Sequence, residues 1–268
     1  MNQQKNDHVW IRLISLGGIG LLGILGILAW FLGRWQEVEA AAIPAGVTEA
    51  DIEESHPVRE PLEAETDRDI VFYRKANDRM EIALTFDDGP HPYYTPLILD
   101  ILAEYDIKAT FFMIGENVKY YPAAAEAVLQ GGHEIGNHTN HHRGLKSMTA
   151  KDILREIEDC EDEIFSLAEY RPKLVRPPEG AMSDRVRQVV RDLNYRIILW
   201  DLDTLDWAHT PPSEICRHVL DEVEAGDIIL MHDFIGHNSP TPEALRLMIP
   251  ELLSRGYKFV TVGELLDN

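Results

Sequence analysis

Acidic and histidine side chains that could bind a metal ion and activate water gather in two short stretches of this 268-residue sequence. The first stretch is TFDDGP, where Asp87 and Asp88 end an apolar run and directly precede Gly89 and Pro90. Successive side chains at a strand end point in different directions, so the two carboxylates are expected to have different tasks. One could hold a cation while the other moves a proton. The alternative is a turn with two solvated aspartates.

The second stretch is HTNHH, with histidines at positions 138, 141 and 142. On a helical turn, His138 and His142 would share one face because they are four residues apart. With a carboxylate from another strand end they would form a ligand set that suits Zn²⁺ and leaves a position for water. Such a cation lowers the pKa of its bound water to about 7. The alternative is a surface cluster of histidines.

Three more motifs carry groups suited to proton transfer or sugar binding. Arg176 begins RPPEG, where a fixed guanidinium could clamp Asp87 bidentately and keep it ionised. In DTLDW, Asp206 precedes Trp207, whose ring face could stack on a sugar. His232 ends the apolar run ILMH and is the remaining imidazole, which suits a general acid. The alternatives are a surface cation, a loop carboxylate and a structural histidine.

The elements that position these groups alternate between strands and helices from about residue 70. Apolar runs predict strands at 82–86, 109–114, 133–137, 173–176, 195–202, 227–231 and 257–262. Helical spacing and capping residues predict helices at 95–102, 122–130, 149–164, 183–193, 212–224 and 242–255. No Gly-rich phosphate loop follows a strand, which argues against a dinucleotide-binding sheet. The sequence therefore predicts an α/β fold, a closed or nearly closed (β/α) barrel with about seven parallel strands.

Polar groups follow the predicted strands at their carboxyl ends, where the active sites of such barrels lie. These groups are Asp87 with Asp88, residues 138–142, Arg176, residues 203–207, and His232 with Asp233. If the strands are parallel, all of these groups meet at one end of the barrel.

The motifs, in this order, resemble those of the polysaccharide deacetylases of carbohydrate esterase family 4, which include peptidoglycan and chitooligosaccharide deacetylases. The resemblance covers about residues 80–265. It rests on TFDDGP, HTNHH, RPPEG, DTLDW and LMH, at 85–90, 138–142, 176–180, 203–207 and 230–232. It implies a distorted (β/α) barrel that removes N-acetyl groups from amino sugars with a divalent metal. Zn²⁺ is the expected cation, and Co²⁺, Mn²⁺ and Ni²⁺ are the alternatives.

The resemblance also implies a role for each motif residue. Asp87 is similar to the family's catalytic base, and Arg176 would tune it. Asp206 would orient His232, which resembles the acid that protonates the leaving amine. The implied metal ligands are Asp88, His138 and His142. The implied substrate contacts are Pro178, Glu179, Trp207 and Leu230.

One position departs from the family's pattern. Glu179 stands where an aromatic residue is usual. Its backbone N–H can still help to bind an oxyanion, but an aromatic wall is replaced by a carboxylate near the metal. We expect this change to affect the sugar preference more than the chemistry.

An apolar segment at residues 13–33 precedes the predicted domain. It carries no charged residue and, at 1.5 Å per residue, is long enough to cross about 30 Å of bilayer. Flanking tryptophans and preceding cations favour an uncleaved, single-pass signal anchor, with residues 1–12 in the cytoplasm and the catalytic domain outside the cell membrane. A cleaved signal peptide and a buried core helix are the alternatives. Residues 34–69 are predicted to be an acidic flexible linker, and 70–268 the catalytic domain.

Charge and cysteine content narrow the partners. The net charge of −21 argues against nucleic acid and against docking to anionic lipids. Cys160 and Cys216 fall on apolar helix faces and are expected to be buried thiols, with a disulfide as the alternative.

The main hypothesis is an anchored deacetylase acting on N-acetylglucosamine or N-acetylmuramic acid of peptidoglycan. An O-acetyl esterase on another polysaccharide and a non-catalytic glycan-binding protein are the alternatives. The sequence predicts no oligomeric state.

Overall fold

The structure, a computed structural model, describes residues 70–76 and 78–267. The predicted cytoplasmic segment, membrane anchor and linker, at 1–12, 13–33 and 34–69, lie outside these residues and stay predictions. Every helix in the described part is too short or too polar to cross a bilayer.

The strands form one sheet in which all paired strands run parallel. Their order is β1-β6-β5-β4-β3-β2-β8-β7, with β9 beside β2. The strands are β1 (Val71–Phe72), β2 (Glu81–Asp87), β3 (Thr110–Met113), β4 (Glu134–Asn137), β5 (Leu174–Val175), β6 (Arg196–Ile198), β7 (Leu202–Asp203), β8 (Ile228–His232) and β9 (Lys258–Phe259). β1 and β7 end this path without pairing to each other in the described residues, so the strands form a half-barrel.

The predicted parallel α/β fold is confirmed, but the number of strands and the closure of the barrel differ from the prediction. The predicted strand at 195–202 divides into β6 and β7 because the chain changes partners there. The backbone N–H of Leu199 donates to the carbonyl of Phe72, whereas that of Asp201 donates to the carbonyl of Ile228. The strand β1 was not predicted, since two residues carry too little pattern.

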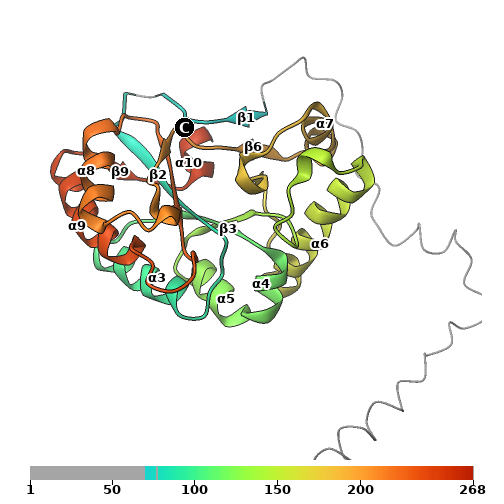
Figure 1. Cartoon of the computed structure of the whole chain (residues 1–268), viewed down its shortest axis with the longest axis horizontal. Helices are drawn as coiled ribbons and strands as arrows, with labels where there is room; N and C mark the ends of the chain where they lie inside the picture. The colour runs from blue at the N-terminus through green and yellow to red at the C-terminus, as the bar shows by residue number, and fades with distance from the viewer. Residues whose placement is uncertain (1–69, 77, 268) are drawn as a thin grey trace, which may run out of the picture. The chain divides into compact units, whose positions relative to one another are not determined.

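Helices flank the strands on both sides, with α8 beside α9 at one edge of Figure 1 and α6 and α7 at the opposite edge. The helices are α3 (Tyr94–Glu104), α4 (Gly115–Tyr120), α5 (Pro122–Gln130), α6 (Ala150–Ala168), α7 (Asp184–Asp192), α8 (Pro212–Glu222), α9 (Thr241–Ser254) and α10 (Val262–Asp267). Two of the predicted caps are confirmed: the Thr149 and Ser183 hydroxyls accept from the backbone at the start of α6 and α7. The helices α4 and α10, of 6 residues each, were not predicted.

The central strand β2 is buried along its whole length and pairs with β3, β8 and β9. The rings of Phe86 and Phe111 stack across β2 and β3 with centroids 4.9 Å apart. Cys160 is buried in the same core and donates to the carbonyl of Met113, and burial raises the pKa of its thiol. Cys160 and Cys216 are both free, so the structure contains no disulfide between them.

Replacing Gly136 with alanine should destabilise the fold close to the polar strand ends. A Cβ atom at Gly136 would lie 2.4 Å from two ring carbons of Phe112, its partner on β3. The guanidinium carbon of Arg176 in turn lies over the Phe112 ring, 4.1 Å from the ring centroid. We expect a loss of about 1–3 kcal/mol in the free energy of unfolding, measured by urea denaturation. Gly144→Ala is the control, since nothing lies within 4 Å of its added Cβ; an equal loss there would contradict the account.

Candidate active site

The carboxyl ends of the parallel strands bring the predicted groups together, as the sequence predicted. Asp87 ends β2 and lies in register with His232, which ends the neighbouring strand β8. His138 and Arg176 directly follow the paired ends of β4 and β5. The convergence is a consequence of parallel pairing alone, because each polar group follows its strand at the same edge of the sheet.

Asp88, His138 and His142 form one compact group of candidate metal ligands, with one ligand atom from each lying within 4.8 Å of the others. The Oδ1 atom of Asp88 lies 3.1 Å from Nε2 of His142 and 3.4 Å from Nε2 of His138. Burial acts to raise the pKa of Asp88, but the two imidazoles outweigh it and hold that pKa well below its usual range.

The donor atoms of this group fit a divalent cation. Nδ1 of His138 lies 2.7 Å from the carbonyl oxygen of Arg176 and must donate to it, so Nε2 is the ring atom that faces Asp88 and would bind a cation. Such a partner on the second nitrogen is typical of metal-binding histidines. Apart from the two imidazoles, buried Asp88 Oδ1 has no hydrogen-bond donor among the described residues. Two neutral imidazoles and one carboxylate are a common ligand set for Zn²⁺.

The turn that carries the histidines is not helical, so the predicted helical spacing is not what brings His138 and His142 together. The chain leaves β4 and takes positive φ angles at Thr139 (66°) and His142 (52°). Because of these two positive φ angles the turn folds back, and both imidazoles face Asp88.

Glu156 on α6 holds this turn and was missed by the sequence analysis. Its carbonyl accepts from the Asn140 backbone, and its carboxylate accepts from the backbone N–H of His141 and lies 3.0 Å from Nδ1 of that ring. His141 therefore lies outside the metal group, as the resemblance implied. The signal that could have found Glu156 is its place among the regularly spaced buried positions of α6, near Ile153 and Ile157.

Arg176 is fully buried and pairs with Asp87, although not in the bidentate manner predicted. Its NH1 group donates to Oδ1 of Asp87 at 2.7 Å. The remaining donor contacts go to Thr85 Oγ1, the Ile198 carbonyl and the Leu199 carbonyl. The guanidinium is thus fixed by the strand ends and offers Asp87 one charged hydrogen bond. The other carboxylate oxygen of Asp87 lies 3.7 Å from Nε2 of His138, on the side of the metal group.

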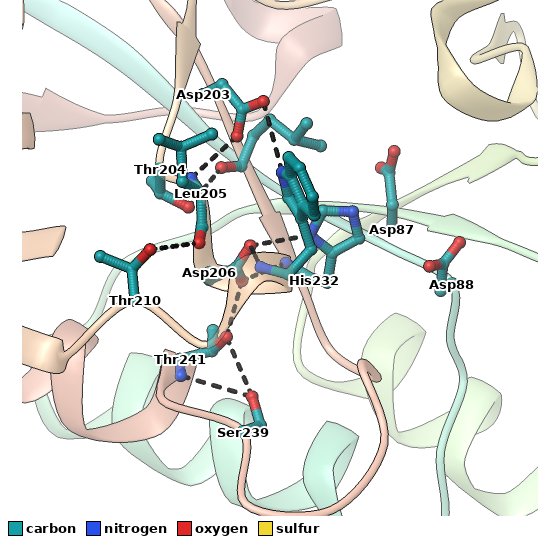
Figure 2. Close-up of polar contacts among 12 residues, drawn as sticks. Asp87, Asp88, Asp203, Thr204, Leu205, Asp206, Thr210, His232, Ser239 and Thr241 are labelled. Atoms are coloured by element: carbon teal, nitrogen blue, oxygen red, sulfur yellow. Dashed lines mark hydrogen bonds and ion pairs between the residues drawn. The ribbon is translucent and has the colours of Figure 1, made fainter.

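His232 and Asp206 form a second charged pair beside Asp87. The backbone N–H and the Nδ1 atom of His232 both donate to the buried Asp206 carboxylate, at 2.8 Å each. Burial acts to lower the pKa of His232, but Asp206, with smaller effects of Asp87 and Asp88, raises it to about 9. Figure 2 shows the His232 ring between Asp206 and the two neighbouring aspartates. Because Nδ1 is bound to Asp206, Nε2 is the ring atom available for proton transfer.

The predicted substrate contacts lie around the same strand ends but differ in exposure. Glu179 is exposed at a φ of 57°, next to buried Pro178 in the short turn after β5. Trp207 is 52% exposed, whereas Leu230 on β8 is 4% exposed. Asp203 was missed as a positioning group: its carboxylate accepts from the Leu205 backbone and from the indole N–H of Trp207.

A candidate cation site with a paired carboxylate on one side and a histidine–aspartate pair on the other is the arrangement of a metal-dependent hydrolase. Sequence comparison agrees with this class. The chain belongs to the polysaccharide deacetylase family: the family pattern described as Polysaccharide deacetylase matches residues 74–198, and a 41% identical relative is covered over most of its length.

That relative is a peptidoglycan-N-acetylglucosamine deacetylase of Bacillus cereus, and the alignment of 198 residues covers 73% of this chain and 92% of the relative. A crystal structure of the Bc1960 peptidoglycan N-acetylglucosamine deacetylase has 34% identity and a TM-score of 0.71, over 73% of this chain and 92% of that one. The structure of BA3943, a CE4 family pseudoenzyme from Bacillus anthracis, has 31% identity and a TM-score of 0.69, over 73% and 68%. Because the family includes a pseudoenzyme, catalysis depends on which site residues a member carries.

Proposed function

We propose that this protein removes N-acetyl groups from amino sugars of cell-wall peptidoglycan by metal-dependent hydrolysis. The relatives named as peptidoglycan deacetylases support this substrate. One observation carries the chemistry: Asp87 and His232 lie in register on neighbouring strands, beside the group formed by Asp88, His138 and His142. A base, an acid and a cation site are therefore close enough to act on one bond.

In this proposal Asp88, His138 and His142 hold the cation, and Zn²⁺ is the favoured ion because of the nitrogen and oxygen donors. When bound, a divalent cation polarises the acetamide carbonyl and lowers the pKa of a water molecule. The chain's own residues supply the remaining steps.

Asp87 is the proposed base. Its free oxygen lies on the side of the metal group, and its other oxygen is held by buried Arg176. As a water molecule attacks the carbonyl carbon, Asp87 takes one of its protons. The charged hydrogen bond from Arg176 orients the carboxylate before the attack.

His232 is the proposed acid. A pKa of about 9 keeps its imidazole protonated at neutral pH, with Nδ1–H bound to Asp206. As the carbon–nitrogen bond breaks, Nε2 gives its proton to the departing nitrogen. The products are acetate and a free amine on the sugar. The backbone N–H of Glu179 is the proposed donor to the oxygen that carries negative charge during the attack.

Trp207 and Leu230 complete the proposed substrate contacts. The exposed Trp207 ring offers a stacking face for a sugar, and Asp203 holds its indole N–H. Leu230, buried two residues before His232, would form the apolar floor for the acetyl methyl group. We further propose that residues 13–33 anchor the enzyme in the membrane, so that it acts on cell-wall glycan outside the cell. This proposal rests only on the apolar character of that segment.

The proposal is tested by incubating the full chain and Zn²⁺ with N-acetylglucosamine oligosaccharides and with peptidoglycan fragments. We expect mass spectrometry to show sugars that have exchanged an acetyl group for hydrogen, with an equal amount of acetate. Acetate release from acetylated xylan but not from these substrates would instead favour the O-acetyl esterase. Glycan binding without acetate release from any of them would favour the non-catalytic alternative.

Replacing Asp206 with asparagine should make the activity sensitive to alkaline pH. The raised pKa of His232, about 9, depends on the Asp206 charge. Without that charge the pKa should fall toward the ordinary value of about 6.5, so the acid form is lost as pH rises above about 6.5. We expect the alkaline limb of the pH profile of kcat to move down, with the largest loss of rate near pH 8. An alkaline limb that stays in place would remove His232 as the acid.

A further inference from the structure

We propose that Thr241 is a positioning residue of the reaction: its hydroxyl donates to Asp206 and thereby fixes the carboxylate that holds the acid His232. The inference rests on the proposed function for its catalytic consequence, whereas the contacts themselves do not depend on it. Thr241 lies outside all of the motifs that the sequence analysis singled out.

Asp206 is completely buried and its carboxylate accepts from four donors. Oδ1 accepts from Nδ1 of His232 at 2.8 Å and from the backbone of Trp207 at 2.9 Å. Oδ2 accepts from the backbone of His232 at 2.8 Å and from Oγ1 of Thr241 at 2.7 Å. Thr241 is thus the one side chain besides His232 among these donors. It comes from α9, 35 residues further along the chain than Asp206.

The direction of the Thr241 hydroxyl is set by its other neighbour. The ionised carboxylate of Asp206 can only accept, so Thr241 must donate to it. The Oγ of Ser239 lies 3.1 Å from Oγ1 of Thr241 and donates to it. The backbone of Thr241 in turn donates to Ser239 at 3.3 Å. A hydroxyl that accepts one hydrogen bond donates the next one more strongly.

Figure 2 shows Ser239, Thr241, Asp206 and His232 as a continuous series of contacts that ends beside Asp87. Thr241 is fully buried and is the first residue of α9, so the positive end of a 14-residue helix also lies next to Asp206. The series joins the start of α9 to the proposed acid through groups that are all hydrogen-bonded.

The Thr241 hydroxyl should weaken the hold of Asp206 on the protonated imidazole. The titratable groups that interact with the charge of His232 are Asp206, Asp87, Asp88 and the adjacent Asp233. A donor on Oδ2 of Asp206 draws off part of the carboxylate charge, so His232 releases its proton more readily. Without the hydroxyl, Asp206 should bind the imidazolium more tightly, so that His232 releases its proton less readily.

Thr241 also stands at the start of α9, where a hydroxyl can stabilise the helix without acting on His232. A purely structural role of this kind predicts the same effect for any threonine at a helix start. Thr261 is a matched control: its hydroxyl accepts from the Glu264 backbone at the start of α10, and it is not part of the site. Thr241→Val and Thr261→Val both remove the hydroxyl of a threonine at a helix start. Thr241→Ser keeps the hydroxyl and should restore the native behaviour.

The test measures kcat, KM and the pKa of His232 by NMR for the full chain loaded with Zn²⁺. For Thr241→Val we expect a loss in kcat of about ten-fold, part of the 10²–10⁴-fold effect of a general acid, with KM unchanged. The pKa of His232 should rise in this variant, and it should stay in place in Thr241→Ser and Thr261→Val. If Thr241→Val does not fold, Thr241→Ala removes the same donor and carries the same test.

With the reaction intact, a native kcat in Thr241→Val or an equal loss of kcat in Thr261→Val would overturn the proposal. An unchanged pKa of His232 in Thr241→Val would also overturn it. If the unchanged protein releases no acetate at all, the proposed function fails, and the NMR titration still decides whether Thr241 acts on His232 through Asp206.

Discussion

Replacing Asp87 with asparagine should abolish acetate release while the cation stays bound. Asparagine cannot take a proton from water, so we expect a loss in kcat of about 10²–10⁴-fold. The metal group does not include Asp87, so the metal content should be unchanged. Steady-state kinetics and elemental analysis on the same preparation measure both effects.

The same change should also lower stability, because it leaves the charge of fully buried Arg176 without its carboxylate. Breaking a buried ion pair costs about 3–5 kcal/mol, and the asparagine oxygen can offset part of this by accepting from the guanidinium. The activity must therefore be measured well below the unfolding temperature. Asp100→Asn is the matched control, an exposed aspartate of α3 outside the site. Full activity of Asp87→Asn would remove Asp87 from the mechanism, and a parallel loss of metal would place it among the ligands.

Replacing His138 with alanine should remove the cation and with it the activity. The change deletes Nε2, one ligand atom of the group with Asp88 and His142. It also deletes the hydrogen bond from Nδ1 to the carbonyl of Arg176, which orients the ring. Because the remaining ligands are a single imidazole and a carboxylate, we expect less than one equivalent of metal to survive dialysis, measured by elemental analysis.

His141→Ala is the sharpest control for this result, since His141 lies in the same HTNHH motif. Its ring pairs with Glu156 and lies outside the metal group. We expect His141→Ala to keep its metal. Unchanged stoichiometry in His138→Ala, or equal losses in both variants, would show that the ligands have been assigned wrongly.

The convergence of the site could be predicted from the sequence because it depends on two simple properties. Apolar runs mark the buried strands, and Asp87, His138, Arg176 and His232 each stand at the carboxyl end of one. Parallel pairing then brings these ends to one edge without further information. The same reasoning located Asp206, because it lies within a motif next to a strand end.

The features that were missed depend on contacts between distant parts of the chain. The half-barrel was predicted as a more nearly closed barrel because the change of partners between β6 and β7 leaves no mark in the apolar run. The positive φ angle at Thr139 could not be expected from a β-branched residue, and the one at His142 could not be fixed from residue type alone. Glu156 and Thr241 reach the site from helices, and each reads in sequence as an ordinary helical residue.

The most direct test of the account is a crystal structure of the protein with Zn²⁺, with anomalous scattering recorded on both sides of the zinc absorption edge. We expect one peak in the anomalous difference map, from a zinc ion bound by the Asp88 carboxylate and by Nε2 of His138 and His142 at about 2.0–2.2 Å. We also expect Asp87 to stay paired with Arg176 beside the ion, outside its ligand shell. A peak held by other residues, or none at this position, would contradict the central claim that these strand ends share one catalytic cation.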